Sequence, residues 1–334
     1  MKAFILEKYG GPDGTLVREW QQPEPKAGEV LIEVHAAGLN PVDFKLRQKQ
    51  VWPIVRLTLP WPMGNECAGV VKQVGSGVTK VKSGDRVMVR VAKSALGACA
   101  EMVCVPESLV ALMPASMSFK EGAALPLVGL TALQCLFELG GLKRGEKVFI
   151  QAGAGGVGTI AIQLAKQAGA HVITTASGAG IALCRRLGAH EVIDYKANRW
   201  QDAVKDVDLV FDALGPEAVM DAFKVLKPGG RVISIAGPVT LDTARRNGVP
   251  LVFHPVFWAM GRSAEAAARR AGMTYQYWFM RPDGDQLADL AARFERKELE
   301  VVIDKTFPFE HVKEALAYVE SGRAKGKVVV ELKP

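Results

Sequence analysis

A glycine-rich turn between a strand-like and a helix-like segment constrains the fold of this chain more than any other feature. Gly153, Gly155 and Gly158 form the pattern GxGxxG within "KVFIQAGAGGVGTIAIQLAKQAGA". A tight turn, close approach of the backbone to a pyrophosphate, and close packing of helix on strand each require a missing side chain. The N-terminus of the helix adds free N–H groups that can bind an anion. GxGxxG alone is a weak signal, but its strand and helix context favours a dinucleotide site over a plain structural turn.

The segment after the next predicted strand indicates which dinucleotide binds. An acid at the end of that strand would hold the ribose 2′-OH of NAD, but no Asp or Glu occurs between His171 and Glu191. Ser177 offers a hydroxyl there, and Arg185 and Arg186 follow, which favours the 2′-phosphate of NADP. The alternative is that both arginines lie on the solvated face of a helix.

Strand-like and helix-like segments alternate after the glycine turn. The strands "HVITTAS", "EVIDY", "VDLVFDAL" and "RVISIAG" are separated by the helical segments "AGIALCRRLG" and "PEAVMDAFKVLK". This alternation predicts βαβ units and a doubly wound parallel sheet. Before residue 118, short β-branched runs broken by Gly and Pro predict a mostly antiparallel β domain. We therefore expect one domain from residues 1–118 and 272–334 and a nucleotide-binding domain from 119–271.

Length, composition and charge agree with two globular domains. A chain of 334 residues is longer than one core usually supports, and no apolar run is long enough to span a bilayer. The N-terminus lacks a signal-peptide pattern, and five cysteines without regular spacing favour a reducing compartment. We predict a cytoplasmic protein. The net charge is +7, and the basic residues are scattered along the chain rather than clustered. This distribution argues against binding of nucleic acid and fits binding of an anionic small ligand.

The motifs together resemble one known superfamily. The stretches "AAGLNPVDFKLR", "GNECAGVVKQVGSGVTKVKSGDRV", "AALPLVGLTALQCL", "AGAGGVGTIAIQLAKQAGA", "LGAHEVIDY" and "SGRAKGKVVV" are similar to medium-chain dehydrogenases/reductases. Within that superfamily they resemble the zinc-free quinone oxidoreductase and alkenal/enone reductase branch. The resemblance covers nearly the whole chain and is weakest at residues 240–285. It implies an α/β fold with a GroES-like, mostly β catalytic domain and a Rossmann domain, assembled as a homodimer.

Two asparagines argue against a catalytic metal. Zinc-dependent members of the superfamily carry a Cys where Asn40 stands and a His where Asn65 stands, immediately before Glu66. An Asn amide is a poor substitute for either zinc ligand. Those members also bind structural zinc through four closely spaced cysteines, but residues 88–105 contain only two, Cys99 and Cys104. Cys67 is then better explained as a small buried apolar residue than as a nucleophile.

Without a metal, the chemistry that the resemblance implies is hydride transfer to an acceptor that is already electrophilic. Quinones and α,β-unsaturated carbonyls qualify, whereas simple alcohols do not. In "NPVDFK" the resemblance places Asn40, Asp43 and Lys45 near the nicotinamide, with Lys45 stabilising an enolate or contacting the ribose. The alternative is structural: Asn40 caps the following helix, Asp43 is an acid in its first turn, and Lys45 is solvated.

The resemblance implies further contacts with the cofactor, NADPH. Relatives usually place a Lys near the 2′-phosphate, but this chain has Ala179 and Gly180 there, so Ser177 has to supply more of the NADPH preference. The expected cofactor-binding residues are Gly153, Gly155, Gly156, Val157 and Gly158 in the turn, and Thr131, Ser177, Tyr195, Leu214, Ala236, Gly237, Arg323 and Lys327 elsewhere.

Residues 253–281 allow more than one interpretation. The aromatic stretch "MTYQYWFM" could line the acceptor pocket through Tyr275 or Tyr277, or form an edge strand at a dimer interface. The helical segment before it has an apolar first half that either covers the site or is buried at an interface. We predict an NADPH-dependent, zinc-independent quinone reductase. The alternatives are a reductase of the C=C bond of enals and enones, and an NADPH-binding protein with little catalysis.

Overall fold

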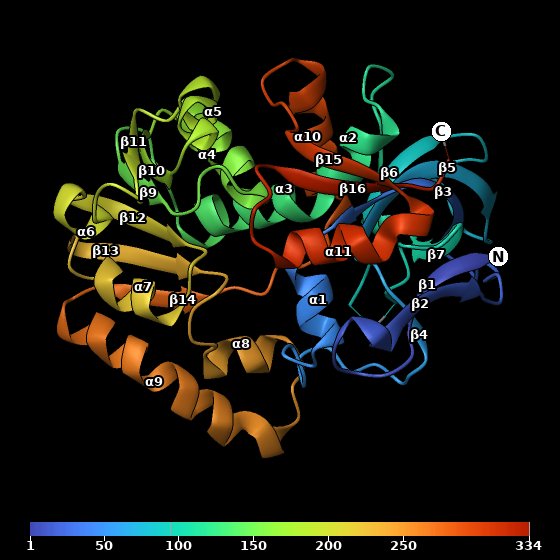
Figure 1. Cartoon of the computed structure of the whole chain (residues 1–334), viewed down its shortest axis with the longest axis horizontal. Helices are drawn as coiled ribbons and strands as arrows, with labels where there is room; N and C mark the ends of the chain where they lie inside the picture. The colour runs from blue at the N-terminus through green and yellow to red at the C-terminus, as the bar shows by residue number, and fades with distance from the viewer. Residues whose placement is uncertain (94, 334) are drawn as a thin grey trace. The chain divides into compact units, whose positions relative to one another are not determined.

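The computed structural model describes residues 1–93 and 95–333 (Figure 1). The glycine turn directly follows one strand of a six-stranded parallel sheet. The strand order is β11-β10-β9-β12-β13-β14, the arrangement of two βαβαβ halves that meet between β9 and β12. The strands are β9 (Lys147–Ile150), β10 (His171–Ala176), β11 (Glu191–Asp194), β12 (Val207–Asp212), β13 (Leu226–Ser234) and β14 (Thr274–Tyr277). The helices are α4 (Gly156–Gln167), α5 (Ala179–Leu187), α6 (Trp200–Ala203), α7 (Pro216–Ala222), α8 (Leu241–Arg246) and α9 (His254–Arg270).

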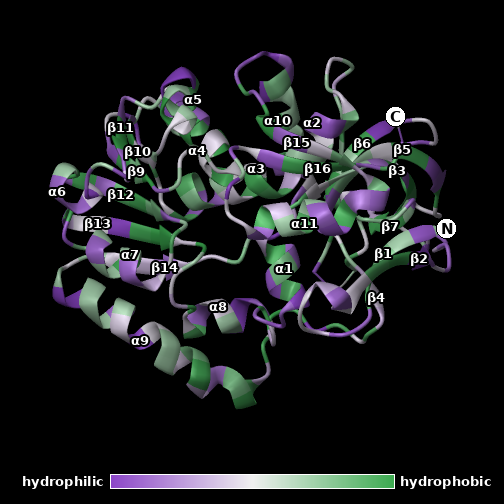
Figure 2. Cartoon of the chain, viewed as in Figure 1, coloured by the Kyte–Doolittle hydropathy of each residue, from purple (hydrophilic) through white to green (hydrophobic). Residues whose placement is uncertain are grey.

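Apolar side chains on one face of this sheet form a buried core. Phe149 packs on Trp200 with ring centroids 5.1 Å apart, and Val210, Val232 and Tyr275 continue the cluster on the neighbouring strands. Each such side chain contributes about 1.5–3 kcal/mol when it is fully buried. Figure 2 shows the corresponding hydrophobic colouring along the central strands. Both faces of a parallel sheet are usually covered, so its strands read in the sequence as β-branched, apolar runs.

A mostly antiparallel sheet organises the second unit, which comprises Met1–Leu130 and Arg281–Pro334. Its strand order is β15-β16-β3-β5-β6-β8, and β7 also pairs with β3. A smaller sheet has the order β2-β1-β4. The strands are β1 (Lys2–Leu6), β2 (Thr15–Glu19), β3 (Glu29–Leu39), β4 (Trp61–Pro62), β5 (Glu66–Val74), β6 (Arg86–Arg90), β7 (Met102–Pro106), β8 (Val110–Leu112), β15 (Ile303–Pro308) and β16 (Lys327–Glu331). The helices are α1 (Pro41–Arg47), α2 (Phe119–Ala124), α10 (Gly284–Glu295) and α11 (Val312–Glu320).

The two units confirm the predicted fold class, and their boundaries differ from the predicted ones. The parallel-sheet unit is Thr131–Met280 rather than 119–271. Helix α2 packs on β3 and β5 of the antiparallel sheet, which places residues 119–130 in that unit, and α3 (Pro126–Leu133) crosses the division. The prediction that the stretch "MTYQYWFM" belongs to the β domain is wrong, because it lies in the parallel-sheet unit. It forms β14, which pairs in parallel with β13.

No helix within the described part of the chain has the length and apolar character needed to cross a membrane.

Candidate functional site

The glycine turn has the close backbone contacts that its sequence predicts. A Cβ on Gly158 would collide with the carbonyl oxygen of Ala152 and lie 2.7 Å from the Cα of Gly153. A Cβ on Gly153 would collide with the hydroxyl of Thr174. Ala152 itself has a φ of 53°, a left-handed conformation that costs an alanine about 1–2 kcal/mol. The turn is thus held in one compact shape by contacts that exclude side chains.

Helix α4 begins at the end of this turn and leaves its first N–H groups available. Its N-cap is Gly155, and no side chain accepts a hydrogen bond at that cap. Unpaired N–H groups and the helix dipole together attract an anion. The turn and the start of α4 therefore fit the pyrophosphate of a dinucleotide.

Two hydroxyl groups meet at the expected adenosine end of the site. Ser177 directly follows β10 and Tyr195 directly follows β11, and the Ser177 Oγ donates a hydrogen bond to the Tyr195 Oη over 2.9 Å. Tyr195 is 55% exposed. These two residues were predicted separately, and the parallel pairing of β10 with β11 brings them together.

The structure explains why no lysine stands at position 180. A Cβ on Gly180 would lie 2.9 Å from the Cβ of Ala154, so the missing side chain lets α5 approach the glycine turn. Ala179, by contrast, is exposed. Arg185 and Arg186 are exposed in the last turn of α5, in agreement with the solvated-helix alternative.

The remaining predicted cofactor residues fall in both units. Thr131 is buried on α3, Leu214 is exposed after β12, and Ala236 and Gly237 follow β13. Arg323 is exposed between α11 and β16 in the other unit. Their contacts with a cofactor stay predictions.

A buried polar cluster lies in the antiparallel unit. Each of its side chains is at most 3% exposed. The cluster consists of Asn40, Asp43, Asn65, Glu66, Arg90 and Lys327.

Lys327 and Glu66 form the ion pair at the centre of this cluster. The Lys327 Nζ donates to the Glu66 Oε1 (2.7 Å), to the Asn40 Oδ1 (2.5 Å) and to the Leu39 carbonyl oxygen (3.0 Å). The other oxygen of Glu66 accepts the backbone N–H of Leu127 (2.6 Å). The structure thus gives the Lys327 amine a full set of partners inside the protein, and its predicted contact with the cofactor stays a prediction.

Asn40 and Asp43 have the structural roles that the alternative interpretation describes. Asn40 is the N-cap of α1, and its backbone N–H donates to the Asp43 Oδ2 (2.8 Å). The Asn40 Nδ2 donates to the Glu66 Oε1 (2.6 Å), so both ends of this amide are engaged. The Asn65 Nδ2 donates to the Asp43 Oδ1 (2.6 Å). Lys45 lies half-buried on the same helix.

Burial shifts two ionisable groups of the cluster. Burial raises the pKa of Asp43 to about 6, and the hydrogen bonds from Asn65 and Asn40 oppose that shift. Burial lowers the pKa of Arg90 to about 10, while Glu66 and Asp43 act in the opposite direction. By side-chain type the cluster thus contains two acids, Asp43 and Glu66, and two bases, Arg90 and Lys327.

The cluster's donor set does not suit zinc. The amides of Asn40 and Asn65, which the resemblance places where zinc-dependent members carry ligands, are hydrogen-bonded to carboxylates. The described residues contain no group of three or more His, Cys, Asp or Glu side chains that could hold a metal ion. Cys67 is fully buried, and burial raises the pKa of its thiol, as expected for an unreactive buried cysteine.

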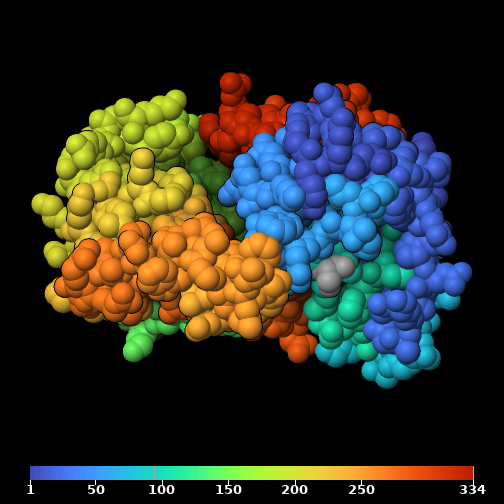
Figure 3. Space-filling model, turned by 90° about the horizontal axis from the view of Figure 1, so that it is seen from below, coloured from blue at the N-terminus to red at the C-terminus, as the bar shows by residue number. Residues whose placement is uncertain are grey.

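Residues 253–281, which the sequence left open to more than one interpretation, contain helix α9 and strand β14. Tyr275 is buried in the core of the parallel sheet, and burial raises the pKa of Tyr277 to about 12. β14 is an edge strand of its sheet. The start of α9 and the turn before it are exposed: Leu251 is 80% and Val252 75% accessible. The segment around α8 and α9 forms the orange surface in Figure 3. The predicted cover or interface for this apolar segment stays a prediction.

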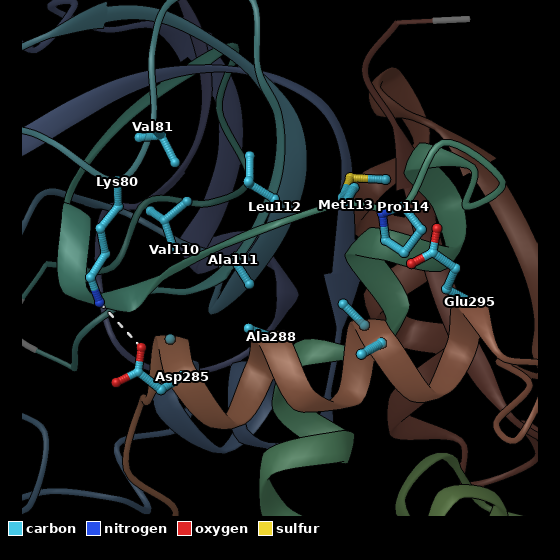
Figure 4. Close-up of a pocket in the computed structure, with 13 residues that line it drawn as sticks. Lys80, Val81, Val110, Ala111, Leu112, Met113, Pro114, Asp285, Ala288 and Glu295 are labelled. Atoms are coloured by element: carbon cyan, nitrogen blue, oxygen red, sulfur yellow. Dashed lines mark hydrogen bonds and ion pairs between the residues drawn. The ribbon is translucent and has the colours of Figure 1, made fainter.

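A groove of about 390 Å³ between β8 and α10 is a poor candidate for a catalytic site. Figure 4 shows its small apolar side chains, among them Ala111 and Ala288, and the Lys80–Asp285 ion pair (3.2 Å) at one end. Both charged side chains are exposed and paired with each other. Glu295 is the remaining charged side chain that lines the groove, at its other end (Figure 4), so the groove does not bring a set of ionisable groups together.

Comparison with known proteins identifies the family. Residues 26–115 match the alcohol dehydrogenase GroES-like domain, and residues 187–330 match the family described as zinc-binding dehydrogenase. The chain is 36% identical to the NADPH-dependent alkenal/one oxidoreductase, chloroplastic, of Arabidopsis thaliana, over 99% of this chain and 79% of the relative. The chain belongs to the medium-chain dehydrogenase/reductase superfamily.

Solved structures place it in the zinc-free branch of that superfamily. The quinone oxidoreductase from Coxiella burnetii superposes with a TM-score of 0.87 at 30% identity, over 100% of this chain and 99% of that one. The Escherichia coli quinone oxidoreductase complexed with NADPH has a TM-score of 0.82 at 25% identity, over 99% and 100%. The chain is thus an NAD(P)H oxidoreductase of the quinone oxidoreductase and alkenal reductase type. The Arabidopsis relative is named as a chloroplastic protein. The cytoplasmic location of this chain stays a prediction.

Sequence reasoning missed three polar residues that the structure makes prominent. Arg90 lies opposite Glu66 in the register of β5 and β6, and Asp212 and Ser234 end two neighbouring strands of the parallel sheet. An acid at the end of the apolar run "VDLVFD" was the available signal for Asp212.

Proposed function

We propose that this medium-chain reductase transfers a hydride from NADPH to quinones, without a metal. The observation that supports the acceptor class most directly is the buried cluster. Asn40 and Asn65 use their amides to bind Glu66 and Asp43, so the positions that hold zinc in alcohol dehydrogenases serve another purpose. An acceptor that needs no Lewis acid, such as a quinone, fits this site.

The preference for NADPH over NADH is supported by the Ser177–Tyr195 hydroxyl pair. Two hydroxyl groups lie 2.9 Å apart beyond β10 and β11, and no acid at the end of β10 repels a 2′-phosphate. The Arabidopsis relative is named as NADPH-dependent, and the Escherichia coli quinone oxidoreductase was solved in complex with NADPH.

The residues of the chain divide the work of such a reaction. NADPH, when bound, supplies the hydride. The glycine turn and the N-terminus of α4 hold the pyrophosphate, and Ser177 with Tyr195 binds the 2′-phosphate. The Lys327–Glu66–Asn40 hydrogen bonds fix the start of α1, which carries Lys45. Lys45 is the cation that we assign to the oxygen on which negative charge develops.

Reduction of the C=C bond of α,β-unsaturated aldehydes or ketones is the second candidate. Its support is the Arabidopsis relative, which is named for alkenals and alkenones and shares 36% identity with the chain. Both acceptors are conjugated carbonyl compounds, so the same site residues would serve either reaction.

Steady-state kinetics separates these functions. We expect NADPH oxidation with a benzoquinone or naphthoquinone acceptor, with kcat/KM for NADPH at least about tenfold above that for NADH. Higher kcat/KM with a 2-alkenal than with any quinone would favour the second candidate. Tight NADPH binding without turnover of either acceptor would refute both and support a binding protein. A Lys45→Met variant, compared with Lys49→Met at the exposed lysine two residues beyond the end of α1, tests the assigned cation through kcat.

A further inference from the structure

Two buried polar side chains end neighbouring strands at the carboxyl edge of the parallel sheet. Asp212 is the last residue of β12 and Ser234 the last of β13, and the two lie opposite each other in the register. Both are 0% exposed. The Ser234 Oγ donates a hydrogen bond to the Asp212 Oδ2 over 2.5 Å. This edge is where doubly wound sheets bind their ligands.

The pair organises the two turns that follow these strands. The Asp212 Oδ1 accepts the backbone N–H groups of Leu214 (3.1 Å) and Gly215 (3.2 Å). The Ser234 Oγ accepts those of Ala236 (3.2 Å) and Gly237 (2.7 Å). Four backbone N–H groups from two turns therefore depend on one hydrogen-bonded pair.

A charged side chain at this place is costly unless it has a specific purpose. No cationic side chain among the described residues pairs with Asp212, and burial raises the pKa of its carboxyl. Asp208, on the same strand, has an ordinary environment instead, with the Lys227 ammonium at 3.0 Å and 20% exposure. Burying an unpaired carboxylate costs free energy that its hydrogen bonds have to offset. The Asp212 carboxylate is better explained by the turns it fixes than by the stability of the sheet.

A second buried polar group at the same edge supports this interpretation. Gln151 follows β9, next to β12 in the sheet, and its backbone N–H bonds to the Phe211 carbonyl oxygen (3.1 Å). It is 1% exposed, and neither its Nε2 nor its Oε1 has a hydrogen-bond partner in the described structure. Buried amides without partners are rare in folded proteins. The edge therefore carries polar groups that the fold alone does not require.

The strand order tells which half of a dinucleotide reaches these turns. The glycine turn that fits the pyrophosphate follows β9, near the middle of the order β11-β10-β9-β12-β13-β14. Ser177 and Tyr195 lie on the β10–β11 side of it, so the adenosine half extends that way. The nicotinamide half then extends over β12 and β13.

We propose that Asp212 and Ser234 are positioning residues for the nicotinamide half of the cofactor. They act through the backbone of the Leu214–Gly215 and Ala236–Gly237 turns. The inference rests on the proposed function, because it requires a nicotinamide dinucleotide at this edge of the sheet.

Split-ligand binding tests the proposal without relying on turnover. Dissociation constants for NADPH and for 2′,5′-ADP, which represents the adenosine half alone, are measured by calorimetry on the full chain. The variants are Ser234→Ala and Asp212→Asn, and the matched control is Asp208→Asn, the second residue of β12. We expect both test variants to weaken NADPH binding by about tenfold, which corresponds to about 1.4 kcal/mol, while 2′,5′-ADP binding changes less than about twofold.

Other results overturn the proposal. An equal loss for both ligands would mean that the pair only stabilises the fold, and no loss for either would mean that the turns do not need it. If Asp212→Asn fails to fold, Ser234→Ala, which removes a single hydroxyl, decides the matter together with its melting temperature. Wild-type protein that binds NADPH but reduces neither acceptor would refute the proposed function alone. Wild-type protein that binds no nicotinamide dinucleotide would refute both.

Discussion

Replacing Lys327 by Met should destabilise the antiparallel unit strongly. The substitution removes three hydrogen bonds and leaves the Glu66 carboxylate, which is 0% exposed, without its ion-pair partner. Breaking one side of a buried ion pair typically costs about 3–5 kcal/mol. Arg90, which interacts electrostatically with Glu66, still compensates part of the charge. We therefore expect the lower end of that range, about 3 kcal/mol.

The double variant Glu66→Gln/Lys327→Met tests whether charge is the cause. The cluster holds two acids and two cations, so removing one of each restores neutrality. We expect the double variant to lose less stability than Lys327→Met alone, because paired removal of buried charges is often nearly neutral. Lys333→Met is the matched control, since its ion pair with Glu33 is on the surface at 44% lysine exposure and should contribute less than about 1 kcal/mol.

The assay has to separate the two units. Three tryptophans, Trp20, Trp52 and Trp61, lie in the antiparallel unit and the other three lie in the parallel-sheet unit. Fluorine NMR of protein labelled with 5-fluorotryptophan can therefore follow urea unfolding of each unit at pH 7. A Lys327→Met loss no larger than that of Lys333→Met, or a double variant less stable than the single one, would refute the reasoning.

Three further predictions follow from the site geometry. Burial raises the pKa of Asp43 to about 6, so the folded protein binds this proton more tightly than the unfolded chain does. As the pH rises from about 4 to 6, the free energy of unfolding of the wild type should therefore fall by about 3 kcal/mol relative to that of Asp43→Asn. Urea unfolding midpoints measure this difference, and stability curves that stay parallel across this pH range would contradict the prediction. Gly158→Ala, whose Cβ would collide with the turn, should weaken NADPH binding more than about tenfold in a fluorescence titration, and an unchanged affinity would count against the turn. Ala179→Lys should lower the KM for NADPH about fivefold, whereas Gly180→Lys, 2.9 Å from Ala154, should raise it; the opposite order would place the 2′-phosphate elsewhere.

The glycine turn and the βαβ alternation could be predicted because their signals are local. GxGxxG, the strand before it and the helix after it lie within a single stretch of sequence, and the steric requirements of Gly153 and Gly158 involve neighbours that the same pattern specifies. Ser177 was named from its place after a predicted strand and Tyr195 from the family resemblance, and the structure adds that their hydroxyl groups are hydrogen-bonded. The antiparallel character of the first domain came from short β-branched runs in the same way.

The buried cluster could not be predicted because its partners are distant in sequence. Asn40 and Lys327 are 287 positions apart, yet they share a hydrogen bond. The resemblance implied a cofactor contact for Lys327, but neither the resemblance nor the residues near Lys327 in the sequence pointed to its hydrogen bonds with Asn40 and Glu66. Asp212 had a signal in the sequence, as an acid that ends an apolar run, but its pairing with Ser234 across β12 and β13 could not be predicted because the two are distant in sequence.

The assignment of β14 shows a related limit. Its alternation identifies a strand, but four residues do not specify a partner. The choice between the two sheets is made by Tyr275, which packs into the core of the parallel sheet with Phe149 and Val232. Such packing depends on side chains contributed by distant strands.

The most direct test of the account is NADPH oxidation with a quinone by protein dialysed against a strong chelator. Asn40 and Asn65 are engaged by carboxylates, so the account predicts turnover that is unchanged by metal removal and no oxidation of simple alcohols after zinc is added. Loss of quinone reduction on chelation, with recovery in stoichiometric zinc, would contradict it.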